Sequence, residues 1–311
     1  MRIRFFAASA SLAFCAIVLG CGGGSGSNSP FTGGPTSGGG SVPSSRHVVV
    51  VMEENQIYAS VVGNALVWPN LNKLMMQGAL ATNYYANTHY SIGNYFMLTT
   101  GQILTRDDNS RQIWNVDSIA RRMISAGVSF KIYAEGATQG YTGGNTGQYV
   151  LRHNPFALLS DVADSPTTAR KYIWPFTQLA SDIASNALPQ FSFIIPSIAN
   201  DAHSGPPTQA DAWLQSKVVG PISGTPAFKA GGDGILAVLY DESIVSDTAN
   251  GGGHVAALFW GPLVKPGYRQ SSKTVYQHQS MLATWMAALD LPNPPGQAAN
   301  APVMSEFFVQ K

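Results

Sequence analysis

The sequence predicts an α/β fold in which a mostly parallel central sheet is covered by helices on both faces. Continuous apolar runs rich in β-branched residues, as at 47–52 and 235–240, suit strands that are buried on both sides. Segments of helical period alternate with these runs along the chain, as in parallel sheets. The length of 311 residues is ordinary for a single α/β domain.

The predicted elements follow one another in a regular order. Each strand is an apolar run, and each helix is a segment with apolar residues at helical spacing. The run at 130–135 is the weakest of the strands. The predicted strands are 47–52, 80–86, 130–135, 191–195 and 235–240, and the predicted helices are 71–77, the segment between Ser91 and Gly101, 118–125, 210–219 and 277–289.

The first 45 residues differ in composition from the rest. Residues 1–20 have a positive start, a short apolar run and a small final residue, which indicates a secretory signal. The segment ending in Cys21 resembles a bacterial lipobox, which predicts a lipid on Cys21 and an exported, membrane-tethered protein. A plain secreted protein with a free Cys21 is the alternative. Residues 21–45 are almost wholly small and polar and are predicted to form a flexible tether, which leaves 46–311 as the folded domain.

The charge pattern argues against nucleic acid as a partner. The formal net charge is +1, only 11% of the residues are charged, and no basic run occurs. A partner must therefore be recognised at a local site, and the oligomeric state is not fixed by the sequence.

Polar side chains follow several predicted strands at the point where each strand ends. In parallel sheets ligands bind beyond the carboxyl ends of the strands. Several carboxylates gathered there need a cation. Glu53 and Glu135 also follow strands, but we interpret them as polar turn residues. The residues predicted to meet at this edge are Glu54 and Asn55 after 47–52, Asp201 and His203 after 191–195, and Asp241 and Glu242 after 235–240.

Ser91 lies at a junction between a predicted strand and a predicted helix. A hydroxyl in the first turn of a helix faces free backbone N–H groups and the positive end of the helix dipole, which stabilise phosphate oxygens and a serine alkoxide. The simpler interpretation is that Ser91 is only an N-cap. His153, ahead of a proline turn, and His254, after three glycines, are further candidate ligands, each weak alone.

Six short motifs, taken together and in order, resemble the bacterial phosphoesterase family of acid phosphatases and phospholipases C, which is related to the alkaline phosphatase superfamily. The resemblance covers roughly residues 47–311. It implies an alkaline-phosphatase-like three-layer sandwich that serves as a catalytic domain for phosphate esters. The motifs are Met52-Glu53-Glu54-Asn55, His89-Tyr90-Ser91-Ile92-Gly93-Asn94-Tyr95, Arg152-His153-Asn154-Pro155-Phe156, Asn200-Asp201-Ala202-His203, Asp241-Glu242 and Gly251-Gly252-Gly253-His254.

The resemblance also implies a role for the matched residues. Ser91 is the expected nucleophile, and Asn94 is expected to stabilise the transferring oxygens. His153 and His203 are expected to contact the phosphoryl group, and one of them to protonate the leaving group. The implied ligands of a divalent metal beside the serine are Glu54, Asn55, Ser91, Asp241 and Glu242, and a second metal on Asp201, His203 and His254 is left open. Oxygen ligands suit calcium, magnesium or manganese, whereas histidines favour zinc or iron.

The motif around Ser91 departs from the family pattern at two positions. Acid phosphatases usually carry prolines where Tyr90 and Gly93 stand here, and the phospholipase branch carries other residues after Asn55 and Glu242. The phosphatase branch is the closer one, so we expect a phosphomonoesterase that acts on a small phosphate ester through a phosphoserine. A phospholipase C-type phosphodiesterase and a non-catalytic binding module on the same scaffold are the alternatives.

Overall fold

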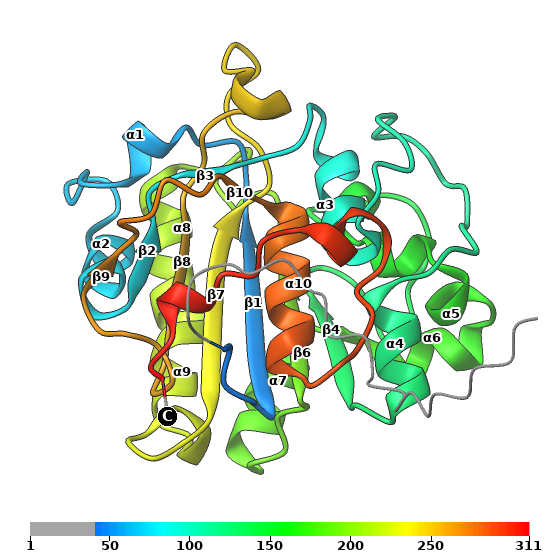
Figure 1. Cartoon of the computed structure of the whole chain (residues 1–311). Helices are drawn as coiled ribbons and strands as arrows, with labels where there is room; N and C mark the ends of the chain where they lie inside the picture. Colours follow the sequence, from blue (N-terminus) through cyan, green and yellow to red (C-terminus); the bar gives the residue numbers. More distant parts are fainter. Residues whose placement is uncertain (1–40, 311) are drawn as a thin grey trace, which may run out of the picture. The chain divides into compact units, whose positions relative to one another are not determined.

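The computed structural model describes residues 41–310, which form a mixed eight-stranded sheet with helices on both faces (Figure 1). The strand order is β5-β4-β6-β1-β7-β8-β2-β9, and β10 and β3 form a separate two-stranded sheet. The strands are β1 His47–Glu53, β2 Ala79–Ala81, β3 Tyr84–Tyr85, β4 Phe130–Ala134, β5 Ile173–Pro175, β6 Phe191–Ile195, β7 Gly234–Tyr240, β8 Ala257–Trp260, β9 Tyr268–Arg269 and β10 Tyr276–Gln277. The helices are α1 Tyr58–Val61, α2 Pro69–Gln77, α3 Ser91–Thr100, α4 Ile119–Ala126, α5 Ser160–Ala163, α6 Pro166–Tyr172, α7 Thr177–Ala184, α8 Pro207–Trp213 with a π-helical continuation Leu214–Val219, α9 Gly220–Ser223 and α10 His278–Ala288.

The strands from β5 to β7 all run in one direction. β1 is parallel to β6 and β7, and β4 is parallel to β5 and β6. β8 is antiparallel to both of its neighbours, β7 and β2. The predicted α/β fold with a mostly parallel sheet is therefore confirmed. Since the parallel strands share one direction, their carboxyl ends meet at one edge of the sheet, where a ligand site is expected.

The predicted strand 80–86 is wrong as a single strand, because β2 joins the main sheet whereas β3 pairs with β10. Between β2 and β3, the backbone N–H groups of Thr82 and Asn83 donate to the side-chain oxygen of Gln270, at 3.1 and 3.0 Å. This side chain satisfies donors that a continuing ladder would use, so the chain can change sheets at this point.

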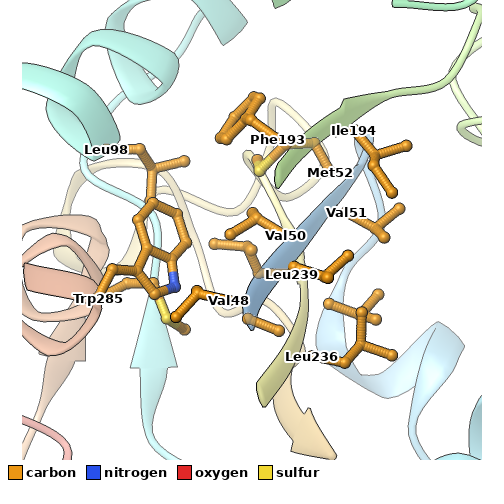
Figure 2. Close-up of a cluster of buried hydrophobic side chains, with 14 of the residues drawn as sticks. Val48, Val50, Val51, Met52, Leu98, Phe193, Ile194, Leu236, Leu239 and Trp285 are labelled. Atoms are coloured by element: carbon orange, nitrogen blue, oxygen red, sulfur yellow. The ribbon is translucent and has the colours of Figure 1, made fainter. Parts of the chain in front are cut away.

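β1 lies at the centre of the core and is buried on both faces. Successive side chains of a strand point to opposite faces. Figure 2 shows Trp285 of α10 and Leu98 of α3 on the side of β1 that carries Val50, and Val51 on the other side. Trp285 also packs edge-on against Phe193 of β6, with ring centroids 6.4 Å apart. α3 and α10 therefore cover the same face of the sheet, while α8 and α9 lie behind it in Figure 1.

The predicted tether 21–45 extends too far toward the domain. The N–H of Ser45 donates to the carbonyl of Ala288 at 2.7 Å, and its hydroxyl donates to the carbonyl of Asp233 at 2.6 Å. These hydrogen bonds bury Ser45 against the fold, so the folded part begins before residue 46. The predicted signal 1–20, Cys21 and the tether up to residue 40 lie outside the described residues. Within residues 41–310, no helix has both the length and the apolar character needed to cross a membrane.

Candidate active site

The carboxyl ends of three neighbouring strands are tied together by backbone hydrogen bonds. The N–H of Glu54 donates to the carbonyl of Asp201 at 2.8 Å, and the N–H of Asp241 donates to the carbonyl of Glu53 at 3.0 Å. These bonds continue the ladders of β1 with β6 and β7 past the ends of the strands. The polar residues that follow the three strands are therefore held side by side, as the sequence predicted for this edge.

Ser91 is the first residue of α3, and its side chain faces carboxylates instead of capping the helix. The N-cap is Tyr90, whose side chain makes no capping hydrogen bond, so the simpler interpretation of Ser91 is wrong. The hydroxyl lies 3.2 Å from Glu54 Oε2 and 3.4 Å from Glu242 Oε1. Ser91 itself is only 2% exposed. The structure thus brings the predicted nucleophile and two of its predicted neighbours together at a helix N-terminus.

Gly93 fits the tight packing of this helix start. A Cβ atom at position 93 would lie 2.7 Å from Thr88 Cγ2 and 3.2 Å from the carbonyl oxygen of Thr105. A proline, as in the usual family pattern, would meet the same atoms. The departure at position 93 therefore matches the close approach of the loop that precedes α3.

Three buried carboxyl groups, those of Glu54, Asp241 and Glu242, lie around the serine. Burial, Asp241 and Asp201 raise the pKa of Glu54 well above its usual value, and burial and Glu242 do the same for Asp241. Burial and Asp108 raise the pKa of Glu242 to about 8. Burial is the largest cause of these shifts, because loss of water penalises the charged form, and repulsion between the carboxylates adds to it. A bound cation would oppose both effects.

Asn55 adds an amide oxygen to this group of acids. It adopts a left-handed backbone conformation, with φ 51°, and its N–H donates to Asp241 Oδ1 at 3.2 Å. The other oxygen, Asp241 Oδ2, and Asn55 Oδ1 are buried and have no hydrogen-bond partner. Buried oxygens normally have partners, so these two atoms, beside the carboxylates of Glu54 and Glu242, fit the donor set of a hard cation.

His153 lies on the far side of Glu54 from the serine. Its Nε2 is 3.1 Å from Glu54 Oε1, and its Nδ1 is 3.3 Å from Asp201 Oδ2. The Tyr95 hydroxyl donates to Glu54 Oε1 at 2.6 Å, and the Tyr95 and His153 rings are stacked at 5.2 Å. Burial lowers the pKa of His153, and Asp201 opposes that shift. Glu54, His153 and Asp201 can each offer one atom within 4.8 Å of the others, so they form a second group able to hold a metal ion.

His203 lies at the exposed rim of the site, beside Arg152. Its ring Nε2 is 3.1 Å from the guanidinium of Arg152, and its backbone N–H donates to Asp201 Oδ1 at 2.9 Å. A guanidinium only donates, so Nε2 of His203 is the acceptor and Nδ1 carries the proton. Burial and Arg152 lower the pKa of His203, which agrees with a neutral ring.

His254 has other contacts than those predicted. The His254 ring is stacked between Tyr58 and Tyr85, with centroids 4.1 and 4.8 Å away, and its Nε2 faces the carbonyl of Thr82 at 3.1 Å. Within residues 41–310, Asp201, His203 and His254 do not gather as a metal-binding group, because Asp201 lies with Glu54 and His153 instead.

The side chain of Asn94 is buried and serves the loop before α3. Its oxygen accepts from the N–H groups of Asn87 and Thr88 at 3.0 and 3.2 Å, and its nitrogen donates to the carbonyl of Thr88 at 2.8 Å. The amide therefore shapes the loop that carries Ser91, and its contact with phosphate stays a prediction.

Glu53 and Glu135 differ from each other and in part from expectation. Glu53 is the last residue of β1, fully buried on the face opposite to Glu54, so its interpretation as a polar turn residue is wrong. Glu135 accepts from the N–H of Ser197 at 2.8 Å and from Trp213 Nε1 at 3.2 Å, which makes it a structural loop residue.

The site is also lined by residues that have no role in the predicted site, among them Tyr95, Arg152 and Asp108. Tyr95 follows Ser91 by four positions on one helix, a spacing that puts both on one face and could have been used. Arg152 adjoins His153 in its motif, with Nε 3.8 Å from Asp108 Oδ2. Asp108 Oδ1 accepts from the N–H of Ile92 at 3.1 Å. No local signal points to Asp108, because it reaches α3 from a loop without motif.

A mostly parallel sheet that holds a serine at a helix start among buried carboxylates defines a phosphoric-ester hydrolase with an alkaline-phosphatase-like fold. The chain belongs to the Phosphoesterase family, whose model matches residues 67–292. It is 30% identical over 270 residues to a phosphatidylinositol-3-phosphatase of Mycobacterium tuberculosis, an alignment that covers 86% of this chain and 84% of that protein. The suspected family resemblance is thereby confirmed.

Further relatives and solved structures agree with this assignment. A phosphate-repressible acid phosphatase of Penicillium chrysogenum is 31% identical over 233 residues, covering 72% of this chain and 55% of the fungal protein. The chain thus spans about half the length of this fungal relative. A solved protein of the alkaline phosphatase superfamily from Vibrio parahaemolyticus has a TM-score of 0.53 at 13% identity, over 83% of this chain and 71% of that chain. The lipoteichoic acid synthase LtaP from Listeria monocytogenes has a TM-score of 0.53 at 8% identity, over 84% of this chain and 77% of that chain. These two structures show the fold alone.

Proposed function

We propose that this chain is a metal-dependent phosphomonoesterase of the acid phosphatase type that acts through a phosphoserine on Ser91. The observation that carries the proposal is the position of the Ser91 hydroxyl, 3.2 Å from Glu54 and 3.4 Å from Glu242 at the start of α3. The names of the relatives support a monoesterase, since they are a phosphatidylinositol-3-phosphatase and an acid phosphatase. A phospholipase C-type diesterase is the competing reaction.

The donor set around Ser91 fits a divalent cation held by the residues that the resemblance implied. Asp241 Oδ2 and Asn55 Oδ1 are buried without partners, and Glu54 and Glu242 already face the serine. When bound, such a cation supplies Lewis acidity that lowers the pKa of a neighbouring hydroxyl and stabilises developing negative charge. Oxygen ligands favour calcium, magnesium or manganese, whereas a group that includes His153 favours zinc or iron.

The residues of the chain have separate tasks in this mechanism. A carboxylate at Glu54 or Glu242 accepts the hydroxyl proton as Ser91 Oγ attacks phosphorus. The backbone N–H groups at the start of α3 and the Arg152 guanidinium hold the phosphoryl oxygens. We assign two proton transfers to His203, because it is exposed at the rim whereas His153 is fully buried. His203, once protonated from solvent, gives its proton to the leaving group, and the neutral ring then accepts a proton from the water that hydrolyses the phosphoserine.

The test compares Ser91→Ala with Ser192→Ala, in which a buried serine of β6 without a hydrogen-bond partner is removed. Ser91→Ala is expected to reduce release of phosphate from p-nitrophenyl phosphate by at least about 10³-fold and to leave no phosphate on the denatured protein. Ser192→Ala keeps activity within about threefold. Full activity in Ser91→Ala would remove the nucleophile from this position.

The substrate class is tested on the same preparations. Phosphatidylinositol 3-phosphate and p-nitrophenyl phosphate represent monoesters, and phosphatidylcholine and bis(p-nitrophenyl) phosphate represent diesters. We expect faster turnover of the monoesters. Preferential cleavage of the diesters would favour the phospholipase C-type reaction, and binding of inorganic phosphate without any turnover would favour a binding module.

We also propose that the protein is exported and held at a bacterial membrane by a lipid on Cys21. The support is the lipobox-like sequence that ends at Cys21 and the small, polar stretch after it. Cys21→Ser is expected to move the protein from the membrane fraction to the soluble fraction. Unchanged membrane association would contradict a lipid on this cysteine.

A further inference from the structure

His89 stands two residues before Ser91, and both of its ring nitrogens are engaged. Nδ1 contacts Glu242 Oε2, and Nε2 lies 2.9 Å from the carbonyl oxygen of Asp247. The His89 side chain is 12% exposed and that of Glu242 is 2% exposed, so water does not separate the two groups. The ring therefore bridges the loop that carries Ser91 and the loop that follows β7.

The two oxygens of Glu242 have different partners as a result. Oε2 contacts His89, and Oε1 lies 3.4 Å from the Ser91 hydroxyl. A glutamate has three rotatable side-chain bonds, and a fixed contact on one oxygen removes most of that freedom. The contact with His89 thus determines where the oxygen that faces Ser91 lies.

The other end of the His89 ring has a fixed support. Asp247 Oδ2 accepts from the Ser243 hydroxyl at 3.0 Å and from the N–H of His254 at 2.8 Å, so the Asp247 segment is itself held in place. Because a carbonyl only accepts, Nε2 of His89 must be the donor in this contact. The ring orientation is therefore set by the backbone and not by Glu242 alone.

A different histidine supports the other member of the acid pair. His278 Nε2 faces the carbonyl oxygen of Asp241 at 2.6 Å, while its Nδ1 faces the Tyr84 hydroxyl at 2.9 Å. His278 therefore holds the backbone at Asp241, whereas His89 holds the side chain of Glu242. Of the two histidines, only His89 contacts an acidic side chain, that of Glu242, and can therefore orient it toward Ser91.

We propose that His89 is a positioning residue that fixes the Glu242 carboxylate so that Oε1 faces Ser91 and the cation site beside it. The proposal rests on the proposed function, because it assigns Glu242 a place beside the nucleophile. It assigns His89 no contact with substrate.

The experiment divides the two contacts of the ring between two substitutions. The amide nitrogen of asparagine can replace Nδ1, and that of glutamine can replace Nε2. His89→Asn therefore keeps the contact with Glu242 and loses the one with Asp247, while His89→Gln does the reverse. His47→Asn is the matched control. His47, the first residue of β1, also contacts a carboxylate through Nδ1, 2.7 Å from Asp233 Oδ1, but it lies at the end of β1 away from the site.

We expect His89→Asn and His47→Asn to keep kcat within about threefold of the wild type. His89→Gln and His89→Ala are expected to lose about 10- to 100-fold in kcat with little change in KM, as typical of residues that orient a metal ligand. Titration with Mn²⁺ by calorimetry should show weaker binding by His89→Gln than by His89→Asn. Melting temperatures of these two variants should be similar, since each loses one hydrogen bond.

The opposite pattern overturns the proposal. If His89→Gln equals His89→Asn in kcat and in Mn²⁺ affinity, the ring does not act through Glu242. If the losses follow the melting temperature instead of the contact that is kept, His89 only joins two loops. Should the wild-type protein lack phosphatase activity, the proposed function fails, and the Mn²⁺ titration still decides whether His89 positions Glu242.

Discussion

The strand β7 has an aspartate at each end, and the two carboxyl groups lie in opposite electrostatic surroundings. Burial alone would raise the pKa of Asp233, but hydrogen bonds from His47 and from the N–H of Arg46 lower it. Burial and Glu242 raise the pKa of Asp241 well above its usual value. The amino end of the strand thus holds a compensated pair near solvent, and the carboxyl end holds buried acids whose pKa values stay raised although Glu242 contacts His89.

This contrast separates a structural carboxylate from a functional one. An ion pair near solvent contributes little and needs no further partner. A cluster of buried acids costs stability unless a ligand completes it, which is why perturbed pKa values gather at functional sites. A buried acid with a raised pKa is not always functional. Glu53, on the other face of β1, is also buried with a raised pKa, and burial is again the main cause. Position beside Ser91, as for Glu54, is therefore required in addition to burial.

The largest effect is expected from Glu54→Gln, which sharpens the comparison between the two faces of β1. Removing the carboxylate 3.2 Å from Ser91 should lower kcat/KM on p-nitrophenyl phosphate by about 10²- to 10³-fold. Glu53→Gln, on the opposite face, should leave kcat/KM within about threefold. Equal losses of kcat/KM in the two variants, measured at equal folded fraction by circular dichroism, would show that the two faces of β1 do not differ in function.

The next largest effect compares the two ends of β7. Asp241→Asn should lower the metal content of the purified protein and reduce kcat by about 10²-fold, because it removes one charge from the cation site. Asp233→Asn should leave the metal content unchanged. Elemental analysis of both variants is the measurement, and an unchanged metal content in Asp241→Asn would place the metal elsewhere.

A smaller effect is expected in the pH dependence of stability of the metal-free protein. Carboxyl groups with raised pKa values bind more protons in the folded state than in the unfolded chain, from the unfolded value near about 4 up to about 8 for Glu242. The free energy of unfolding should therefore fall as pH rises from about 5 to 8. Adding Mn²⁺ should weaken this trend, and Asp241→Asn should reduce it. Melting temperatures that rise over this range in chelator would contradict the prediction.

The smallest effect is expected from His47→Ala at the amino end of β1. Since the side chains of His47 and Asp233 are 32% and 35% exposed, loss of the pair should cost about 0–1 kcal/mol in urea denaturation, without loss of activity. The pKa of Asp233 is lowered in the folded state, so the contribution is present above about pH 4 and is lost as pH falls further. A tenfold loss of activity would show that this end of the strand also serves the site.

The sequence predicted the strands of the sheet better than the loops that complete the site. The runs at 47–52, 191–195 and 235–240 correspond to β1, β6 and β7, because a strand buried on both faces leaves a continuous apolar run in the sequence. The sequence also predicted that Ser91 begins a helix that ends before Gly101. The structure agrees, with α3 at Ser91–Thr100 and Gly101 at a left-handed φ of 67°.

The loops depended on contacts that no local pattern records. A metal on Asp201, His203 and His254 was left open from the sequence, but His254 lies between two tyrosines. The strand predicted at 80–86 is divided by the side chain of Gln270. Asp108 approaches the serine helix from a loop, and Arg152 from the short 3₁₀ helix Leu151–His153. Each of these placements joins residues far apart in the chain.

The sequence by itself determined which chemical groups end the parallel strands, because a continuous apolar run and the polar residues that follow it are local features of the chain. Only the tertiary structure decided that His89 reaches Glu242, that His153 lies between Glu54 and Asp201, and that Asn94 holds its own loop. The physical reason is that these contacts are set by how loops from distant strands pack against each other, where one bond rotation changes the partner of a side chain.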